Sequence, residues 1–449
     1  MEKPRVILLN CGEEVYPQEW LRNVIGQVNS ALEGLELELA GVHTIVNEQM
    51  ARDALQSIKG KEFDLILVHL VSWHITSYVM FVLKEFRDVP ILVWATGGKT
   101  DAGGKLPSPA APAAITALLP VFREMGYKYK AIYEKPDEPH RFKDVESFAR
   151  VAGAYRKIRS SRIGLVGYAD MGLYTCTYDR TSIANKLGID IEDYFSFEIG
   201  KQMEEVPENE INTVISGMKK ELVFENDVSQ KVLDRVARLY KVLKNKVGER
   251  GLDAISIKCV YGVTRYMGVN PCMAQSMLAN RDLSVICECD AYGLVTNVML
   301  SKLTGHTAAF MENYEFLDNE ILVGTCGFMP FDFVEGPVKV RSANLGDFFV
   351  GLSNVSRVKT GTVTFARLYK SGESYRMFLS RGEAKPPMKW VELGWEEPTP
   401  DFPSMLIKLE MPVQRYMENV PGQHIIVAYG DHVEEMKDLC KLMDIEVVC

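Results

Sequence analysis

Apolar runs alternate with helical spacing along the first third of the chain. The segments RVILLN (5–10), DLILVHLVSW (64–73) and PILVWATGG (90–98) are typical of buried strands, and SYVMFVLKEF (77–86) has the spacing of a helix. This alternation predicts βαβ units and a mostly parallel sheet. A Gly/Pro/Ala-rich stretch at 97–114 follows the third strand, at the edge of an open sheet where ligands bind.

The same pattern starts again near residue 160. Strand-like RIGLVG (162–167) is followed by a helical pattern at 229–247, then by DAISIKCV (253–260) and LSVICECDAYG (283–293). The turn GLVGYADMG lacks the G-x-G-x-x-G spacing of a dinucleotide site, so we interpret it as an ordinary turn from strand to helix.

From about residue 335 the pattern changes to short strand-like runs separated by Gly, Pro and Ser, which predicts an antiparallel sandwich or barrel. An amphipathic helix and a closing strand end the chain. We therefore expect an α/β protein with two Rossmann-like α/β domains with parallel sheets, at 1–160 and 161–303. An antiparallel β-barrel-like domain at 304–449 follows them.

Composition narrows the class of protein. The 449 residues carry a net charge of −9, which argues against nucleic acid or an anionic membrane as a partner. Nine cysteines without a CxxC pair favour free thiols in a reducing compartment. No signal-peptide pattern opens the chain, and its apolar runs are too short to cross a bilayer. We expect a cytoplasmic enzyme.

Three side chains stand out as candidates for chemistry. Glu288 interrupts an apolar strand between two cysteines, and a buried glutamate needs a partner or a metal ion. A loop amide could also satisfy Glu288. Taken alone, Glu312 in FMENYEF fits a solvent-facing residue, and His424 in VPGQHIIVAYG fits a hydrogen-bonded core residue. Spacing alone does not assemble these three residues into a site.

A resemblance to a known family joins them. The stretch 288–312 resembles the L-fucose isomerases and, more loosely, the L-arabinose isomerases. Glu288-Cys289-Asp290 matches the E-x-D element of the fucose isomerases, and Leu-Thr-Gly at 303–305 follows at the same offset. FMENY, which contains Glu312, is close to the F-M-E-D-Y of the arabinose isomerases. The ending GQHIIVAYG is similar to the C-terminal segment of both families.

The resemblance implies a metal-dependent aldose–ketose isomerase that works through a cis-enediolate. Glu288, Glu312 and His424 would be the metal ligands, and the two glutamates would also act as acid and base. Such a donor set suits Mn²⁺, with Co²⁺, Fe²⁺ or Mg²⁺ as substitutes. Gln423 stands where the fucose isomerases have an Asn next to the ligand histidine.

Other positions depart from the family pattern or leave alternatives open. Asp290 would lie on the same strand face as Glu288 if the strand continues, and would orient Glu288 or a sugar hydroxyl; otherwise it is a turn residue. Cys326 replaces a family histidine and could be a pocket wall, which we favour, a soft ligand, or neither. Trp73 and His74 resemble a W-x-H-T element without its spacer. They would bind sugar, or Trp73 would plug the sheet edge.

The family also implies a homo-oligomer, a hexamer or another trimer-based assembly, with active sites near subunit interfaces. A competing hypothesis is a non-catalytic carbohydrate-binding or regulatory homologue, and epimerisation on the same site is a third. No arginine cluster for a phosphate is evident, although Arg265 and Arg281 could serve. The sequence does not name the sugar, so aldoses and acidic or sulfonated sugars are all candidates.

Overall fold

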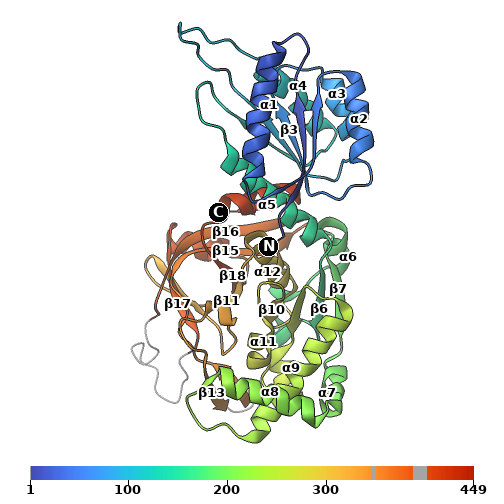
Figure 1. The fold of residues 1–449 in the computed structure, drawn as a ribbon. Coiled ribbons are helices and arrows are strands. Elements are labelled where there is room, and N and C mark those ends of the chain that lie inside the picture. The colour runs from blue at the N-terminus through green and yellow to red at the C-terminus, as the bar shows by residue number, and fades with distance from the viewer. Residues whose placement is uncertain (1, 345–349, 388–401, 449) are drawn as a thin grey trace. The chain divides into compact units, whose positions relative to one another are not determined.

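The computed structural model describes residues 2–344, 350–387 and 402–448. Backbone contacts divide the chain into two compact units, Met1–Arg156 with Glu435–Met443, and Lys157–Glu434 with Asp444–Cys449. Figure 1 gives the labels of the helices and strands.

The first unit is built on a five-stranded parallel sheet with the order β2-β1-β3-β4-β5. The strands are β1 (Arg5–Cys11), β2 (Glu38–Ile45), β3 (Leu65–Leu70), β4 (Ile91–Ala95) and β5 (Tyr129–Tyr133). The predicted strands at 5–10, 64–73 and 90–98 are present, although β3 ends at Leu70. Strand order reverses between β1 and β3, which is the position where open α/β sheets bind ligands.

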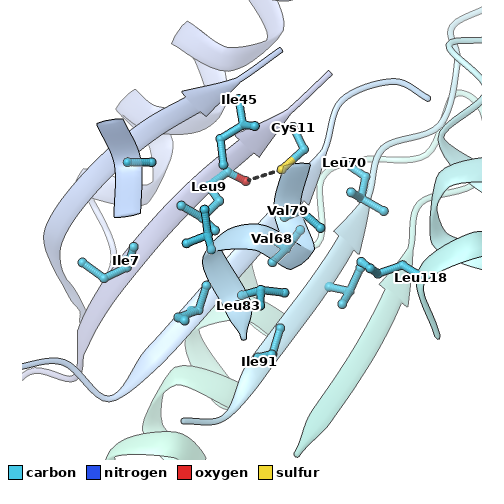
Figure 2. Packing of buried hydrophobic residues seen from close by; sticks show 14 of the residues in the cluster. Ile7, Leu9, Cys11, Ile45, Val68, Leu70, Val79, Leu83, Ile91 and Leu118 are labelled. Atoms are coloured by element: carbon cyan, nitrogen blue, oxygen red, sulfur yellow. Dashed lines mark hydrogen bonds between the residues drawn. The ribbon is translucent and has the colours of Figure 1, made fainter. Parts of the chain in front are cut away.

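The helices of this unit bury apolar side chains. They are α1 (Gln18–Glu33), α2 (Glu48–Ile58), α3 (Thr76–Leu83), α4 (Ala111–Glu124) and α5 (Phe142–Arg159). From the end of the chain, α14 (Val433–Leu442) contacts β5 through the ion pair of Asp438 with Lys130. Figure 2 shows strand residues such as Leu9, Val68 and Ile91 packed with Val79 and Leu118 of the helices. These continuous apolar strands are typical of a parallel sheet buried on both faces.

The second unit begins with a four-stranded parallel sheet in the order β10-β9-β6-β7. Its strands are β6 (Arg162–Val166), β7 (Asp190–Tyr194), β9 (Ala254–Ile257) and β10 (Ser284–Cys287). The helices are α6 (Arg180–Ser182), α7 (Ser196–Glu205), α8 (Glu208–Glu221), α9 (Gln230–Arg250), α10 (Arg265–Met267), α11 (Cys272–Leu278) and α12 (Ala291–Thr304). The order reverses between β6 and β9.

An antiparallel barrel completes the second unit. The strands run in the order β15-β18-β11-β12-β17-β16, and β15 also pairs with β16, which closes the ring. They are β11 (Ala309–Phe316), β12 (Glu320–Gly324), β15 (Gly361–Ser371), β16 (Ser374–Lys385), β17 (Ser404–Leu409) and β18 (His424–Tyr429). Strand β19 (Ile445–Val448) adds to β16 in parallel, and α13 (Val413–Asn419) precedes β18. The predicted α/β class with an antiparallel β-barrel-like C-terminal region is confirmed.

A small sheet lies beside these two, in the order β14-β13-β8, from β8 (Val223–Phe224), β13 (Lys339–Asn344) and β14 (Val350–Asn354). Antiparallel pairing begins at Ala309, inside the range 304–449 expected for the antiparallel domain. One sequence prediction needs correction. The strand predicted at 283–293 ends at Cys287, because the chain turns there and starts α12 at Ala291.

None of the helices in the described part of the chain combines the length and the apolar run that crossing a bilayer requires.

Candidate metal centre

Glu288 lies in a tight turn that joins β10 to α12. Glu288 and Cys289 both have left-handed backbone, with φ of 67° and 50°, which costs about 1–3 kcal/mol for each residue that is not glycine. Hydrogen bonds hold the turn in place. The Asp170 N–H donates to the Glu288 carbonyl at 3.1 Å, and the Cys289 thiol donates to the Val166 carbonyl at 3.1 Å. The strained turn brings the Glu288 carboxylate, which is buried, to the carboxyl edge of the sheet.

Glu312 and His424 come from neighbouring barrel strands. They are direct partners in the antiparallel pairing of β11 with β18, so their side chains leave the barrel wall on the same face. His424 is completely buried, and its ring packs on Phe310 with the ring centres 4.3 Å apart. The pairing therefore brings together two residues that are 112 positions apart in the sequence.

The three candidate ligands meet at one point. Glu288, Glu312 and His424 each offer a ligand atom, and these atoms lie within 4.8 Å of one another. His424 Nε2 is 3.2 Å from Glu288 Oε2. Two carboxylates and one imidazole are a donor set that divalent cations such as Mn²⁺ accept. The residues present therefore fit a divalent cation.

The electrostatics of Glu312 also fit a bound divalent cation. Burial raises the pKa of Glu312 to about 7, with a further contribution from the negative charge of Glu288, while His424 acts to lower it. Two carboxylates forced together in a buried site repel each other unless a proton or a cation lies between them. The position of Glu312 is thus unfavourable for the protein alone and favourable for binding a cation.

A buried chain of charged groups stands behind His424. Asp290 Oδ2 accepts a hydrogen bond from His424 Nδ1 at 2.9 Å and also pairs with the Arg367 guanidinium. Arg367 and Asp290 are almost completely buried, and Arg367 also donates to the Thr175 carbonyl at 3.0 Å. With its Nδ1 proton held by Asp290, the imidazole presents Nε2 to Glu288 and Glu312.

These contacts shift both pKa values. Burial would raise the pKa of Asp290, but the charge of Arg367 and the bonds from His424 and Arg367 hold it well below its usual range. Burial would lower the pKa of His424, but hydrogen bonds with Asp290, Cys176 and Glu288 hold it well above its usual value. A cation at Nε2 would therefore compete with a proton.

Cys176, Asp290 and His424 form a second group whose donor atoms lie within 4.8 Å of one another. Arg367 occupies the side of Asp290 that a cation would need, so we interpret this group as support for His424.

The structure also changes the account of Asp290. It caps α12 by accepting from the Gly293 N–H at 2.9 Å, and its other oxygen contacts His424 and Arg367. Within the described residues, the Asp290 carboxylate makes no hydrogen bond with Glu288.

Sequence reasoning missed Arg367. The available signal was the same one that drew attention to Glu288, a charged residue inside an apolar strand pattern, here GTVTFARLY. Gln423 stands directly before His424 in the chain, and its assignment to sugar binding stays a prediction. Its Nε2 is 2.8 Å from His424 Nε2 and 3.5 Å from Glu288 Oε2, so its amide contacts the centre directly.

Cys326 follows β12, which pairs with β11 so that Gly324 stands opposite Glu312. Cys326 is absent from both donor groups found among the described residues. A hydrogen bond with Cys272 and then burial raise its pKa well above the usual value, and the charge of Glu312 adds to this. A thiol kept protonated in this way suits a pocket wall better than a soft ligand.

Trp73 and His74 belong to the first unit and follow β3, where the strand order of that sheet reverses. Trp73 is 40% exposed, while His74 is only 2% exposed. Within the described part of the chain, neither ring nitrogen of His74 has a hydrogen-bond partner, and burial lowers its pKa to about 4. Their assignment to sugar binding stays a prediction.

Exposed aromatic side chains gather at the carboxyl edge of the second parallel sheet. They follow three of its strands, and they are Tyr168, Tyr174, Phe195, Phe197, Tyr261 and Tyr266. Large exposed apolar groups of this kind mark surfaces that another molecule covers.

Comparison with known proteins finds similarity to sugar isomerases. Residues 338–449 match the family model described as the L-fucose isomerase C-terminal domain. The chain is 20% identical over 445 residues to the sulfoquinovose isomerase of Priestia aryabhattai, which covers 96% of this chain and 94% of that protein. It is 21% identical over 370 residues to the sulfoquinovose isomerase of Alkalicoccus urumqiensis, covering 80% of each.

Proposed function

Because the chain belongs to the fucose isomerase-like superfamily, we propose that it is a metal-dependent aldose–ketose isomerase for a free sugar or sugar derivative. The relatives support a sugar isomerase in the broad sense. The observation that carries the finer proposal is the convergence of Glu288, Glu312 and His424 from three separate segments onto one point.

The proposed cofactor is Mn²⁺, with Co²⁺, Fe²⁺ or Mg²⁺ as substitutes, held by Glu288, Glu312 and His424. When bound, the cation would stabilise the negative charge that develops on the sugar oxygens. His424 is kept in orientation by Asp290, which is itself held by Arg367. Gln423 lies close enough to donate a hydrogen bond at the same point, from the side of the imidazole.

Isomerisation moves one proton from C2 of the aldose to C1, while the hydroxyl proton on O2 is lost and O1 gains one. Two carboxylates beside the reacting carbons can do this work, one as base and the other as acid. A pKa near 7, which burial gives Glu312, lets that carboxyl both take and give a proton at neutral pH. We assign the acid–base role to Glu288 and Glu312 as a pair.

We further propose that the protein assembles as a homo-oligomer, with active sites near subunit interfaces. The exposed aromatic side chains at the carboxyl edge of the second parallel sheet support this, because burying them against another copy would remove them from water. Trp73 and His74 remain the candidates for sugar contacts from the first unit.

The direct test is exchange of the C2 proton of a sugar with solvent deuterium, followed by NMR with and without Mn²⁺. The proposal expects exchange and ketose formation with at least one sugar from a panel of neutral, acidic and sulfonated aldoses. Glu288→Gln should abolish exchange, and Glu315→Gln, on an exposed carboxylate of β11, should leave it unchanged. Sugar binding without exchange would favour a non-catalytic carbohydrate-binding protein, and a C2 epimer as product would favour epimerisation.

A further inference from the structure

We propose that Lys258 binds an anionic group on the sugar, so that the substrate is an acidic sugar carrying a sulfonate, carboxylate or phosphate. The inference rests on the proposed isomerase function and adds to it the chemical class of the substrate. It is drawn from four features of Lys258, namely its position, its packing, its lack of a partner and the absence of a better cation at the same edge.

Lys258 is the first residue after β9, at the carboxyl edge of the second parallel sheet. On one side, β9 pairs with β10 so that Ile257 stands opposite Cys287, which places Lys258 next to Glu288. On the other side, Ile257 stands opposite Val166 of β6, and the Lys258 N–H donates to the Val166 carbonyl at 2.9 Å. Strand order reverses between β6 and β9, so Lys258 stands at the switch point of the strand order, which is the position where open α/β sheets bind ligands.

Two glycines make room for the Lys258 side chain. A Cβ added at Gly167 would come within 2.8 Å of Lys258 Cβ, and one added at Gly262 would come within 3.0 Å of Lys258 Cγ. The stem of Lys258 is therefore confined between two stretches of backbone, and the residue is half-buried.

The Lys258 ammonium makes no hydrogen bond or ion pair within the described residues, whereas the neighbouring carboxylates are occupied. Asp170 accepts backbone N–H groups from Met171, Val260 and Tyr261 at 2.9, 2.7 and 3.1 Å. Glu288 faces His424 and Gln423. The ammonium is therefore available to an anionic ligand group, which it would bind with a charge-assisted hydrogen bond.

The two arginines that the sequence suggested are placed less well. Arg265 is exposed, and its guanidinium lies over the Tyr261 ring, 5.8 Å from the ring centre. Arg281 precedes β10, at the opposite end of the strands, and pairs with the exposed Asp282. Of these three basic residues, Lys258 is the half-buried one that lies at the same sheet edge as Glu288.

The test compares the wild type with Lys258→Met, which keeps the packed stem and removes the charge, and with Lys258→Arg, which restores a charge. Lys231→Met, on an exposed lysine of α9, gives the same change in net charge as a control. Each protein is given Mn²⁺ and four sugars that differ only at C6, namely a 6-deoxy, a 6-sulfonated, a uronic and a 6-phosphorylated aldose. Deuterium exchange at C2 then yields KM and kcat for each sugar, and circular dichroism checks the fold.

We expect the wild type to prefer one of the three acidic sugars, and the preferred sugar identifies the anion. Lys258→Met should raise KM for that sugar about 10- to 100-fold, the range for one charge-assisted contact, and leave kcat and the 6-deoxy sugar nearly unchanged. Lys258→Arg should recover part of the loss.

Three results would overturn the inference. If the wild type does not prefer acidic sugars, the inference about Lys258 is overturned, while the proposed isomerase function is unaffected. Equal losses on neutral and acidic sugars in Lys258→Met would assign Lys258 to balancing the charge of the carboxylates. Exchange with none of the sugars would overturn the proposed function, and this inference with it.

Discussion

Glu312 should destabilise the metal-free protein at alkaline pH, and replacing it with glutamine should relieve that cost. The pKa of its carboxyl rises from 4.5 to about 7 in the folded chain because of burial and the nearby charge of Glu288. This difference corresponds to about 3 kcal/mol, an upper value because the residue is only partly shielded from water.

The sign of the effect follows from linkage. Below about pH 4.5 the carboxyl is protonated in both the folded and the unfolded chain, so Glu312→Gln should change little there. As the pH rises through 7, the folded chain must ionise a carboxylate that it disfavours, and the wild type loses stability that the Gln variant keeps. At pH 8.5 we therefore expect Glu312→Gln to be about 1–3 kcal/mol more stable than the wild type.

The assay is urea unfolding of EDTA-treated protein at pH 5 and pH 8.5, followed by circular dichroism, with calorimetry as a second probe. Glu315→Gln, on the same strand but exposed, is the matched control and should change stability by less than about 0.5 kcal/mol at either pH. Added Mn²⁺ should reverse the order, because the wild type gains binding energy that the variant lacks. A Gln variant that is equally or less stable than the metal-free wild type at pH 8.5 would refute the reasoning.

Three further predictions concern the same centre. His424→Ala should lower bound Mn²⁺ at least about tenfold, measured by elemental analysis after dialysis, and unchanged occupancy would remove the imidazole as a ligand. Arg367→Met should destabilise the fold by about 3–5 kcal/mol, because it leaves the Asp290 carboxylate buried without its guanidinium, and it should also weaken Mn²⁺ binding measured by calorimetry. Arg367→Lys should recover part of the stability and part of the Mn²⁺ affinity. Full stability in the Met variant would contradict the chain of charged groups behind His424. EDTA should abolish C2 proton exchange, and Mn²⁺ should restore it; an enzyme indifferent to EDTA would contradict the metal mechanism.

The sequence by itself determined the architecture, and it named the residues of the candidate site. Strand and helix periodicity were sufficient for the parallel sheets, because strands buried on both faces must be apolar throughout. The family resemblance named Glu288, Glu312 and His424, and the structure brings these three together. Their role as metal ligands stays a prediction.

Only the tertiary structure decided how those residues are supported. The sequence left open whether the strand continues through Asp290. It ends at Cys287, because a left-handed turn and the cap of α12 compete with strand continuation, and local pattern does not resolve that competition. Arg367 reaches Asp290 across 77 residues, and Lys258 reaches the Glu288 edge through strand register. Contacts of this kind depend on which strands pair and in what order, so they come into existence only when the sheet and the barrel have closed.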